Sequence, residues 1–161
     1  NSATNALGTL DELYVIAAWT IRQGYWADLC RTFSVGGQPS DLQQSIFDHI
    51  KAFHQQVPKF LWPGRNGSEC FVAMDEHIRQ HPALADVGLV HHAGHNVGLR
   101  AHQMPDLNRD RGGTLAVGNV VSVEPGAYIP EACLGVRLEN MYLITEEGCE
   151  NLSEYPMELV P

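Results

Sequence analysis

Histidine is concentrated in one short stretch of this 161-residue chain. Four of the eight histidines fall within twelve residues: His91, His92, His95 and His102. Two glutamates follow in segments of strand-like composition, Glu124 in SVEPG and Glu139 in VRLEN, and Asp28 comes much earlier. One imidazole with several carboxylates suits a divalent ion of intermediate hardness, such as Mn, Fe, Co or Zn. Spacing alone leaves a metal site and a set of solvated polar groups equally open.

Two apolar segments at the start must position Asp28. Residues 12–20 (ELYVIAAWT) read as a buried strand and residues 25–33 as a second strand, with a tight turn at Arg22-Gln23-Gly24. A hairpin centred there pairs positions that sum to 45, which places Ala17 opposite Asp28.

The middle of the chain has helical periodicity. Ser40 is expected to cap a helix through residues 41–57, with Leu42, Ile46, Ile50 and Phe53 on one stripe. Ser68 is expected to start a second helix that ends at His81, and the histidines of both helices are expected to be exposed.

Strands and loops are expected after Pro82, in residues 87–99, 119–129 and 135–145, followed by a turn at 146–148 and an irregular tail. Period-two geometry puts Arg137 and Glu139 on one face, where the guanidinium would orient the carboxylate. The pattern predicts a single α+β domain over residues 1–161 with an antiparallel-rich sheet.

Composition restricts the partners. The net charge of −9 and only ten scattered basic residues argue against nucleic acid and anionic membranes. No apolar run reaches the roughly 18–20 residues of a membrane span. The four cysteines form no CxxC pair, which favours reduced thiols and a cytoplasmic location.

Four segments resemble, in order, the motifs of the pita-bread metallopeptidase superfamily, which includes Xaa-Pro aminopeptidases, prolidases, creatinase and methionine aminopeptidases. The chain is most similar to the Xaa-Pro peptidases. The segments are GYWADLCRTFSVGG (24–37), HHAGHNVGLRAHQMP (91–105), VVSVEPGAYIP (120–130) and GVRLENMYLITEEG (135–148). The resemblance implies a curved antiparallel sheet with helices on one side, and a family domain whose N-terminal part lies upstream of this chain.

The resemblance also implies a metal site. Asp28 and Glu139 would bridge a pair of ions, and His95 and Glu124 would hold the first ion. The remaining family ligand, an Asp eleven residues before Asp28, is replaced by Ala17. We therefore expect one divalent ion (Mn, Co, Fe or Zn), with the second weak or absent.

The other histidines receive different roles from the resemblance. His91 and His102 match family histidines that contact substrate and stabilise charge on the scissile carbonyl. His92 stands where the family usually has glycine and is expected to be structural.

The implied activity is hydrolysis of a C–N bond in a small peptide or peptide-like amide, with Glu124 transferring a proton to the leaving amine. Two alternatives stay open: a metal-independent hydrolase of the creatinase type, and a non-catalytic module that binds peptide or protein. Because the apolar hairpin needs a cover, we expect either an upstream polypeptide or a homo-oligomer such as a dimer.

Overall fold

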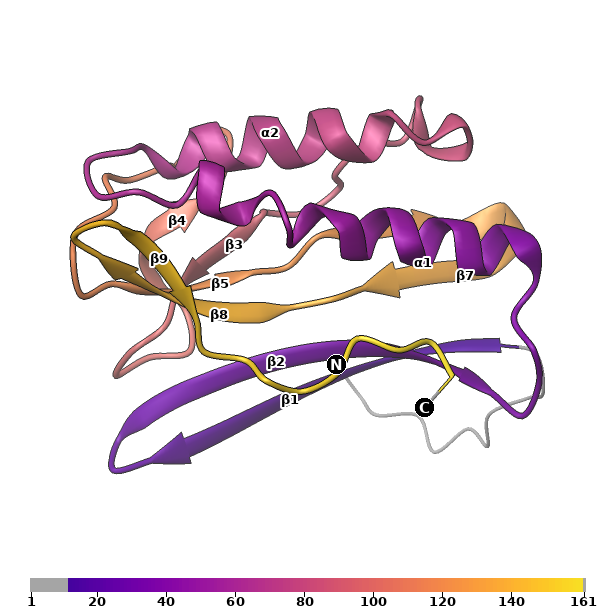
Figure 1. The fold of residues 1–161 in the computed structure, drawn as a ribbon, viewed down its shortest axis with the longest axis horizontal. Helices are drawn as coiled ribbons and strands as arrows, with labels where there is room; N and C mark the ends of the chain where they lie inside the picture. The colour runs from indigo at the N-terminus through magenta and orange to yellow at the C-terminus, as the bar shows by residue number, and fades with distance from the viewer. Residues whose placement is uncertain (1–11, 161) are drawn as a thin grey trace.

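A long antiparallel hairpin begins the described part of the chain, residues 12–160 of this computed structural model (Figure 1). Strand β1 spans Glu12–Arg22 and β2 spans Tyr25–Val35. Gln23 and Gly24 form the two-residue turn, both with positive φ (53° and 86°), which suits the twist of a hairpin.

The register of this hairpin differs from the predicted one. Arg22 pairs with Tyr25, so Trp19 lies opposite Asp28 and Ala17 lies opposite Cys30. The prediction was wrong because it centred the turn one residue too early. Ala17 still lies on the same face of the hairpin as Asp28, because it is two residues from Trp19, which pairs with Asp28.

The prediction of a buried first strand was also wrong. In β1, Ile16, Trp19 and Ile21 are each more than half exposed. Strand β2 is covered on one side and contains buried Asp28 and Cys30. The hairpin therefore presents an apolar surface on β1 while β2 faces the rest of the molecule.

Two helices lie together on one side of the sheet (Figure 1). Helix α1 (Asp41–Phe53) is capped by Ser40, as predicted, and its capping box is completed by Gln43. Helix α2 (Gly67–Arg79) begins one residue before the predicted start at Ser68 and ends two residues before His81, and it is capped by Asn66, which accepts a hydrogen bond from the Ser68 backbone. Short 3-10 turns follow at Val57–Lys59, Pro82–Leu84 and Pro130–Ala132.

The remaining strands, all paired antiparallel, form a five-stranded sheet in the order β4-β3-β5-β8-β9 and a two-stranded sheet of β6 and β7. Their bounds are β3 Gly94–Asn96, β4 Gln103–Leu107, β5 Val120–Val123, β6 Gly126–Ile129, β7 Leu134–Arg137, β8 Asn140–Thr145 and β9 Gly148–Asn151. The predicted turn at 146–148 is present at Glu146–Glu147, but β4 was missed because Pro105 interrupts its pattern, and β9 because its sequence GCEN is short and polar. The core fills the space between helices and sheet, with Ile46, Phe53 and Met74 fully buried.

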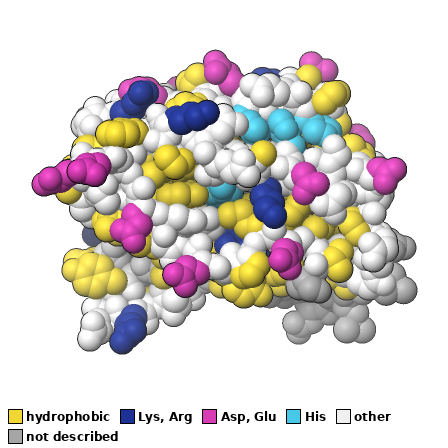
Figure 2. Space-filling view, in the orientation of Figure 1, with side chains coloured by type: hydrophobic (Ala, Val, Ile, Leu, Met, Phe, Trp, Pro, Cys, Tyr) yellow, Lys and Arg dark blue, Asp and Glu magenta, His cyan; other side chains and the backbone are white. Residues whose placement is uncertain are grey.

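The histidines of the helices are less exposed than predicted. Figure 2 shows a row of histidine side chains on the face that carries α1 and α2. His49 stacks on His77 with ring centroids 4.3 Å apart, and its other neighbour His81 lies 5.3 Å away. His54 donates or accepts hydrogen bonds at both ring nitrogens, with the Tyr142 hydroxyl and the Leu138 carbonyl. These rings join the two helices to each other and to the sheet, which is why they are buried or half-buried. Among the described residues, no helix is both long and apolar enough to cross a membrane.

Candidate metal centre

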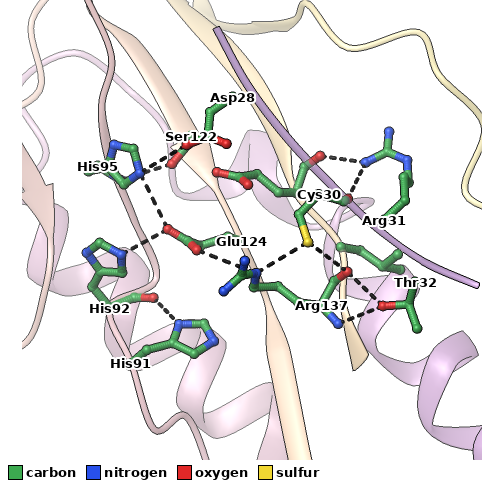
Figure 3. A network of polar contacts seen from close by, with 12 residues as sticks. Asp28, Cys30, Arg31, Thr32, His91, His92, His95, Ser122, Glu124 and Arg137 are labelled. Atoms are coloured by element: carbon green, nitrogen blue, oxygen red, sulfur yellow. Dashed lines mark hydrogen bonds and ion pairs between the residues drawn. The ribbon is translucent and has the colours of Figure 1, made fainter. Parts of the chain in front are cut away.

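Four elements distant in sequence bring the predicted ligands together (Figure 3). Asp28 is on β2, His95 is on β3, Glu124 directly follows β5 and Glu139 directly precedes β8. Backbone hydrogen bonds fix two of these positions: Glu139 donates to the Cys30 carbonyl, and Glu124 donates to the Ala93 carbonyl, both at 2.9 Å. These two bonds tie Glu139 to β2 and Glu124 to the residue before β3.

Gly94 allows His95 to approach its neighbours. A Cβ atom on Gly94 would collide with the Ser122 carbonyl oxygen, and its φ of 154° is one that side chains rarely adopt. The backbone of His95 donates to the Ser122 hydroxyl at 3.2 Å. A glycine is therefore required at the position directly before the candidate ligand.

The four side chains converge on one small volume. His95 Nε2 lies 3.8 Å from Asp28 Oδ2 and 3.6 Å from Glu124 Oε1. Ligand atoms of Asp28, His95 and Glu139 all lie within 4.8 Å of one another. All four residues are between 2% and 6% exposed, so the carboxylates are nearly dehydrated.

The electrostatics show the cost of this arrangement without a cation. Burial, together with the neighbouring carboxylates of Glu124 and Asp28, raises the pKa of Glu139 to about 9. Burial also disfavours the charged form of Glu124, but the hydrogen bond from His92 and the other imidazoles outweigh burial and lower its pKa. Burial, followed by the neighbouring His102, lowers the pKa of His95, which favours the neutral ring that binds metals.

A divalent ion fits these residues. Within this cluster, Asp28 Oδ1 and Glu139 Oε1 have no hydrogen-bond partner among the described residues, and Glu124 Oε1 has only His92 Nε2 at 3.0 Å and His95 Nε2 at 3.6 Å. Buried unpaired carboxylates are costly, whereas coordination to a cation satisfies them. Three carboxylates with one imidazole form a ligand set that suits Mn, Fe, Co or Zn.

Ala17 lies on the Asp28 face of the hairpin, diagonal to Asp28 rather than opposite it. Its methyl group offers no ligand. Diagonal positions across two strands are within reach of longer side chains. A carboxylate at position 17 would therefore point toward the same region.

Arg137 pairs with a different carboxylate from the predicted one. Its Nε lies 4.0 Å from Glu124 Oε2 and 3.3 Å from Cys30 Sγ, and among the described residues it forms no ion pair with Glu139. The strand period fails here because β7 ends at Arg137, before Glu139. Arg137 can therefore orient Glu124.

The two predicted substrate-contacting histidines lie at the edge of the site. His91 holds the Tyr128 hydroxyl at 3.2 Å through Nε2 and the His92 carbonyl at 2.7 Å through Nδ1. The exposed ring of His102 stacks on His95, with centroids 3.6 Å apart and an interplanar angle of 18°. Both rings are thus next to the four-residue cluster and not within it.

Sequence reasoning missed the pair of His92 and Asp106. His92 Nε2 lies 3.0 Å from Glu124 Oε1, and its Nδ1 lies 3.4 Å from Asp106 Oδ1. The hydrogen bond with Glu124 is the main reason that the pKa of His92 is raised, although burial opposes it. The signal for His92 was its place in the histidine stretch, whereas Asp106 lies in the unpredicted strand β4.

Three carboxylates and one imidazole thus lie together in a buried cluster that can hold a divalent ion. Residues 3–146 match the model of metallopeptidase family M24, so the chain belongs to this family. It is 36% identical over 140 residues to the uncharacterized peptidase YqhT of Bacillus subtilis, which covers 86% of this chain and 38% of that protein. It is 32% identical over 149 residues to the Xaa-Pro dipeptidase of Pyrococcus furiosus, at 92% and 42% coverage.

Comparison with solved structures supports the same family and shows the fold. The prolidase from Pyrococcus furiosus superposes with a TM-score of 0.83 at 31% identity, over 91% of this chain and 42% of that chain. The X-Pro aminopeptidase from Thermotoga maritima superposes with a TM-score of 0.85 at 27% identity, over 94% and 42%. The predicted pita-bread fold is confirmed, and the chain spans about two fifths of the length of these relatives.

Proposed function

We propose that this protein is a metal-dependent hydrolase of C–N bonds that acts on small Xaa-Pro peptides. The observation that carries the proposal is the convergence of Asp28, His95, Glu124 and Glu139 in a buried site where Asp28 Oδ1 and Glu139 Oε1 have no hydrogen-bond partner among the described residues. The substrate class follows from similarity to proteins named Xaa-Pro dipeptidase and prolidase.

The metal would be held by Asp28, His95, Glu124 and Glu139. When bound, a divalent ion polarises a carbonyl oxygen and lowers the pKa of water. We expect one ion per chain, because Ala17 supplies no ligand for a second. Manganese is the ion we favour, since three of the four ligands are carboxylates.

The protein's own groups supply the remaining chemistry. Glu124 is kept charged by His92 and by nearby Arg137, so it can accept a proton from the attacking water and deliver it to the leaving amine. His102, stacked on His95, would donate a hydrogen bond to the carbonyl oxygen as charge develops there. His91 donates from Nδ1 to the His92 carbonyl and burial lowers its pKa, so we expect it to contact substrate as a neutral ring that accepts at Nε2.

The surface next to the site offers an apolar wall. Trp19 lies directly opposite Asp28 on the same face of the hairpin and is 57% exposed. An exposed indole beside the ligands suits contact with a proline ring or an apolar side chain of the substrate.

The test is release of proline from a panel of Xaa-Pro dipeptides by protein expressed from its whole gene. Chelator-treated protein should be inactive, and Mn²⁺ should restore turnover. Glu124→Gln should abolish turnover, whereas Glu150→Gln, an exposed control, should not change it. Turnover that persists after chelation would favour the creatinase-type alternative, which the loss of a ligand at Ala17 supports. Absence of turnover on every amide would favour the binding module.

A further inference from the structure

A second set of potential ligands lies beside the carboxylate cluster. Ligand atoms of His92, His95 and His102 all lie within 4.8 Å of one another. His92 lies 5.3 Å from His95 and 5.4 Å from His102 between centroids, each at 30°, whereas His95 and His102 are stacked with centroids 3.6 Å apart and an interplanar angle of 18°. Because stacked rings cannot both direct a nitrogen at one ion, His92 and His95 are the two nitrogen donors, and His102 packs against His95. The set is richer in nitrogen than the one formed with Asp28 and Glu139.

The nitrogens of two of these rings are oriented for coordination. Asp106 Oδ1 lies 3.4 Å from Nδ1 of His92, and the Asn96 carbonyl oxygen lies 3.3 Å from Nδ1 of His95. Metal-binding histidines usually donate their second nitrogen to a carboxylate or a backbone carbonyl, which fixes the ring and its tautomer. Both Nε2 atoms are left directed at the same atom, Glu124 Oε1, at 3.0 and 3.6 Å.

That oxygen is buried and is where the two rings meet. Glu124 is 6% exposed, and its Oε1 atom has His92 Nε2 at 3.0 Å and His95 Nε2 at 3.6 Å. The outer carboxylate is also held in place, because Arg111 pairs with Asp106 Oδ2 at 3.3 Å. Figure 3 shows Glu124 between the rings of His92 and His95, with Arg137 on its other side.

We propose that His92, His95 and Glu124 form a second coordination position, which takes a borderline ion such as Zn²⁺, Ni²⁺ or Cu²⁺. Imidazole ligands favour these ions, whereas Mn²⁺ favours carboxylates. An ion here replaces the proton between His92 Nε2 and Glu124 Oε1. The proposal rests on the proposed function, because the two positions share His95 and Glu124 and cannot both be filled.

Sharing of ligands has a consequence for the reaction. An ion at the nitrogen-rich position removes His95 and Glu124 from the carboxylate position and occupies the group that transfers the proton. Mn²⁺ is expected at the carboxylate position and Zn²⁺ at the nitrogen-rich position. Because the two ions compete for His95 and Glu124, Zn²⁺ in excess should displace Mn²⁺.

The experiment compares metal binding by the parent protein, His92→Gly and Asp106→Asn, with His81→Gln as a control for histidine far from the site. Nitrogen donors are counted from the electron paramagnetic resonance spectrum of bound Cu²⁺. Affinities for Zn²⁺ and Mn²⁺ are measured by titration. Glycine is chosen because the resembling family usually has it at this position, and circular dichroism checks folding.

We expect His92→Gly to lose one nitrogen donor and to bind Zn²⁺ about 100-fold more weakly, with a smaller, about 10-fold loss of Mn²⁺ affinity because His92 also hydrogen-bonds Glu124. Asp106→Asn should weaken Zn²⁺ binding about 10-fold through loss of the orienting carboxylate. An unchanged nitrogen count in His92→Gly, or an equal loss of Zn²⁺ and Mn²⁺, overturns the proposal. If His92→Gly does not fold, unchanged Zn²⁺ affinity in Asp106→Asn overturns it. Failure of the parent to bind Mn²⁺ would instead refute the carboxylate position.

Discussion

Glu139→Gln should stabilise the metal-free protein while it removes the metal site. Glu139 is 2% exposed and lies against two other carboxylates, and burial followed by those charges raises its pKa to about 9. The folded protein therefore holds this proton more tightly than the unfolded chain, whose glutamate has a pKa of 4.5. For a group of this kind, the free energy of unfolding is highest below pH 4.5 and falls as the pH rises toward 9.

The magnitude follows from the interval between the two pKa values. Each pH unit within that interval costs about 1.4 kcal/mol, so by pH 7 the free energy of unfolding has lost about 3 kcal/mol. Glutamine has nearly the shape of a protonated glutamate and carries no charge at any pH. The variant should therefore exceed the parent by about 3 kcal/mol at pH 7 and by nearly nothing at pH 4.5.

The assay is urea unfolding in the presence of chelator at several pH values, with exposed Glu150→Gln as the matched control. Addition of Mn²⁺ at 1,000 times its Kd should reverse the order, because a ligand at that concentration stabilises a protein by about 4.1 kcal/mol, which exceeds the difference of about 3 kcal/mol, and the variant lacks one ligand. Equal or lower stability of Glu139→Gln at pH 7 without metal would show that Glu139 is not held among uncompensated charges. The control should follow the parent throughout.

Three further outcomes are expected. Ala17→Asp should raise the Mn²⁺ stoichiometry from one to two, because position 17 shares a face with Asp28; an unchanged stoichiometry would show that a carboxylate there does not reach the site. His95→Ala should lose Mn²⁺, whereas His102→Ala should retain Mn²⁺ and mainly slow turnover, since His102 is not among the carboxylate-side ligands; equal loss in isothermal titration would refute that assignment. Trp19→Ser together with Ile21→Ser should reduce self-association in analytical ultracentrifugation, because both side chains are exposed on the hairpin; an unchanged sedimentation profile would show that this surface does not drive association.

Much of the fold was predictable because local chemistry determines it. Gly24 permits the tight hairpin turn, and Ser40 with Gln43 completes a capping box, so these boundaries are encoded by a few adjacent residues. The four ligand positions were predictable from motif resemblance, and the sheet brings Asp28 and Glu139 together although they are far apart in sequence.

Other features depend on tertiary context. The observed hairpin register differs from the predicted one because the turn is centred one residue later. As a result, Trp19 rather than Ala17 lies opposite Asp28. The exposure of β1 was not predictable, since an apolar strand has the same composition whether or not its face is covered. The role of His92 was hidden because its partner Asp106 lies on a strand whose pattern Pro105 interrupts.

The most direct test of the metal centre is the number of Mn²⁺ ions bound per chain, measured by equilibrium dialysis of chelator-treated protein. The four buried ligands and the alanine at position 17 predict one ion, which should be lost in Glu139→Gln. No bound Mn²⁺, or two ions bound tightly by the parent protein, would contradict the account.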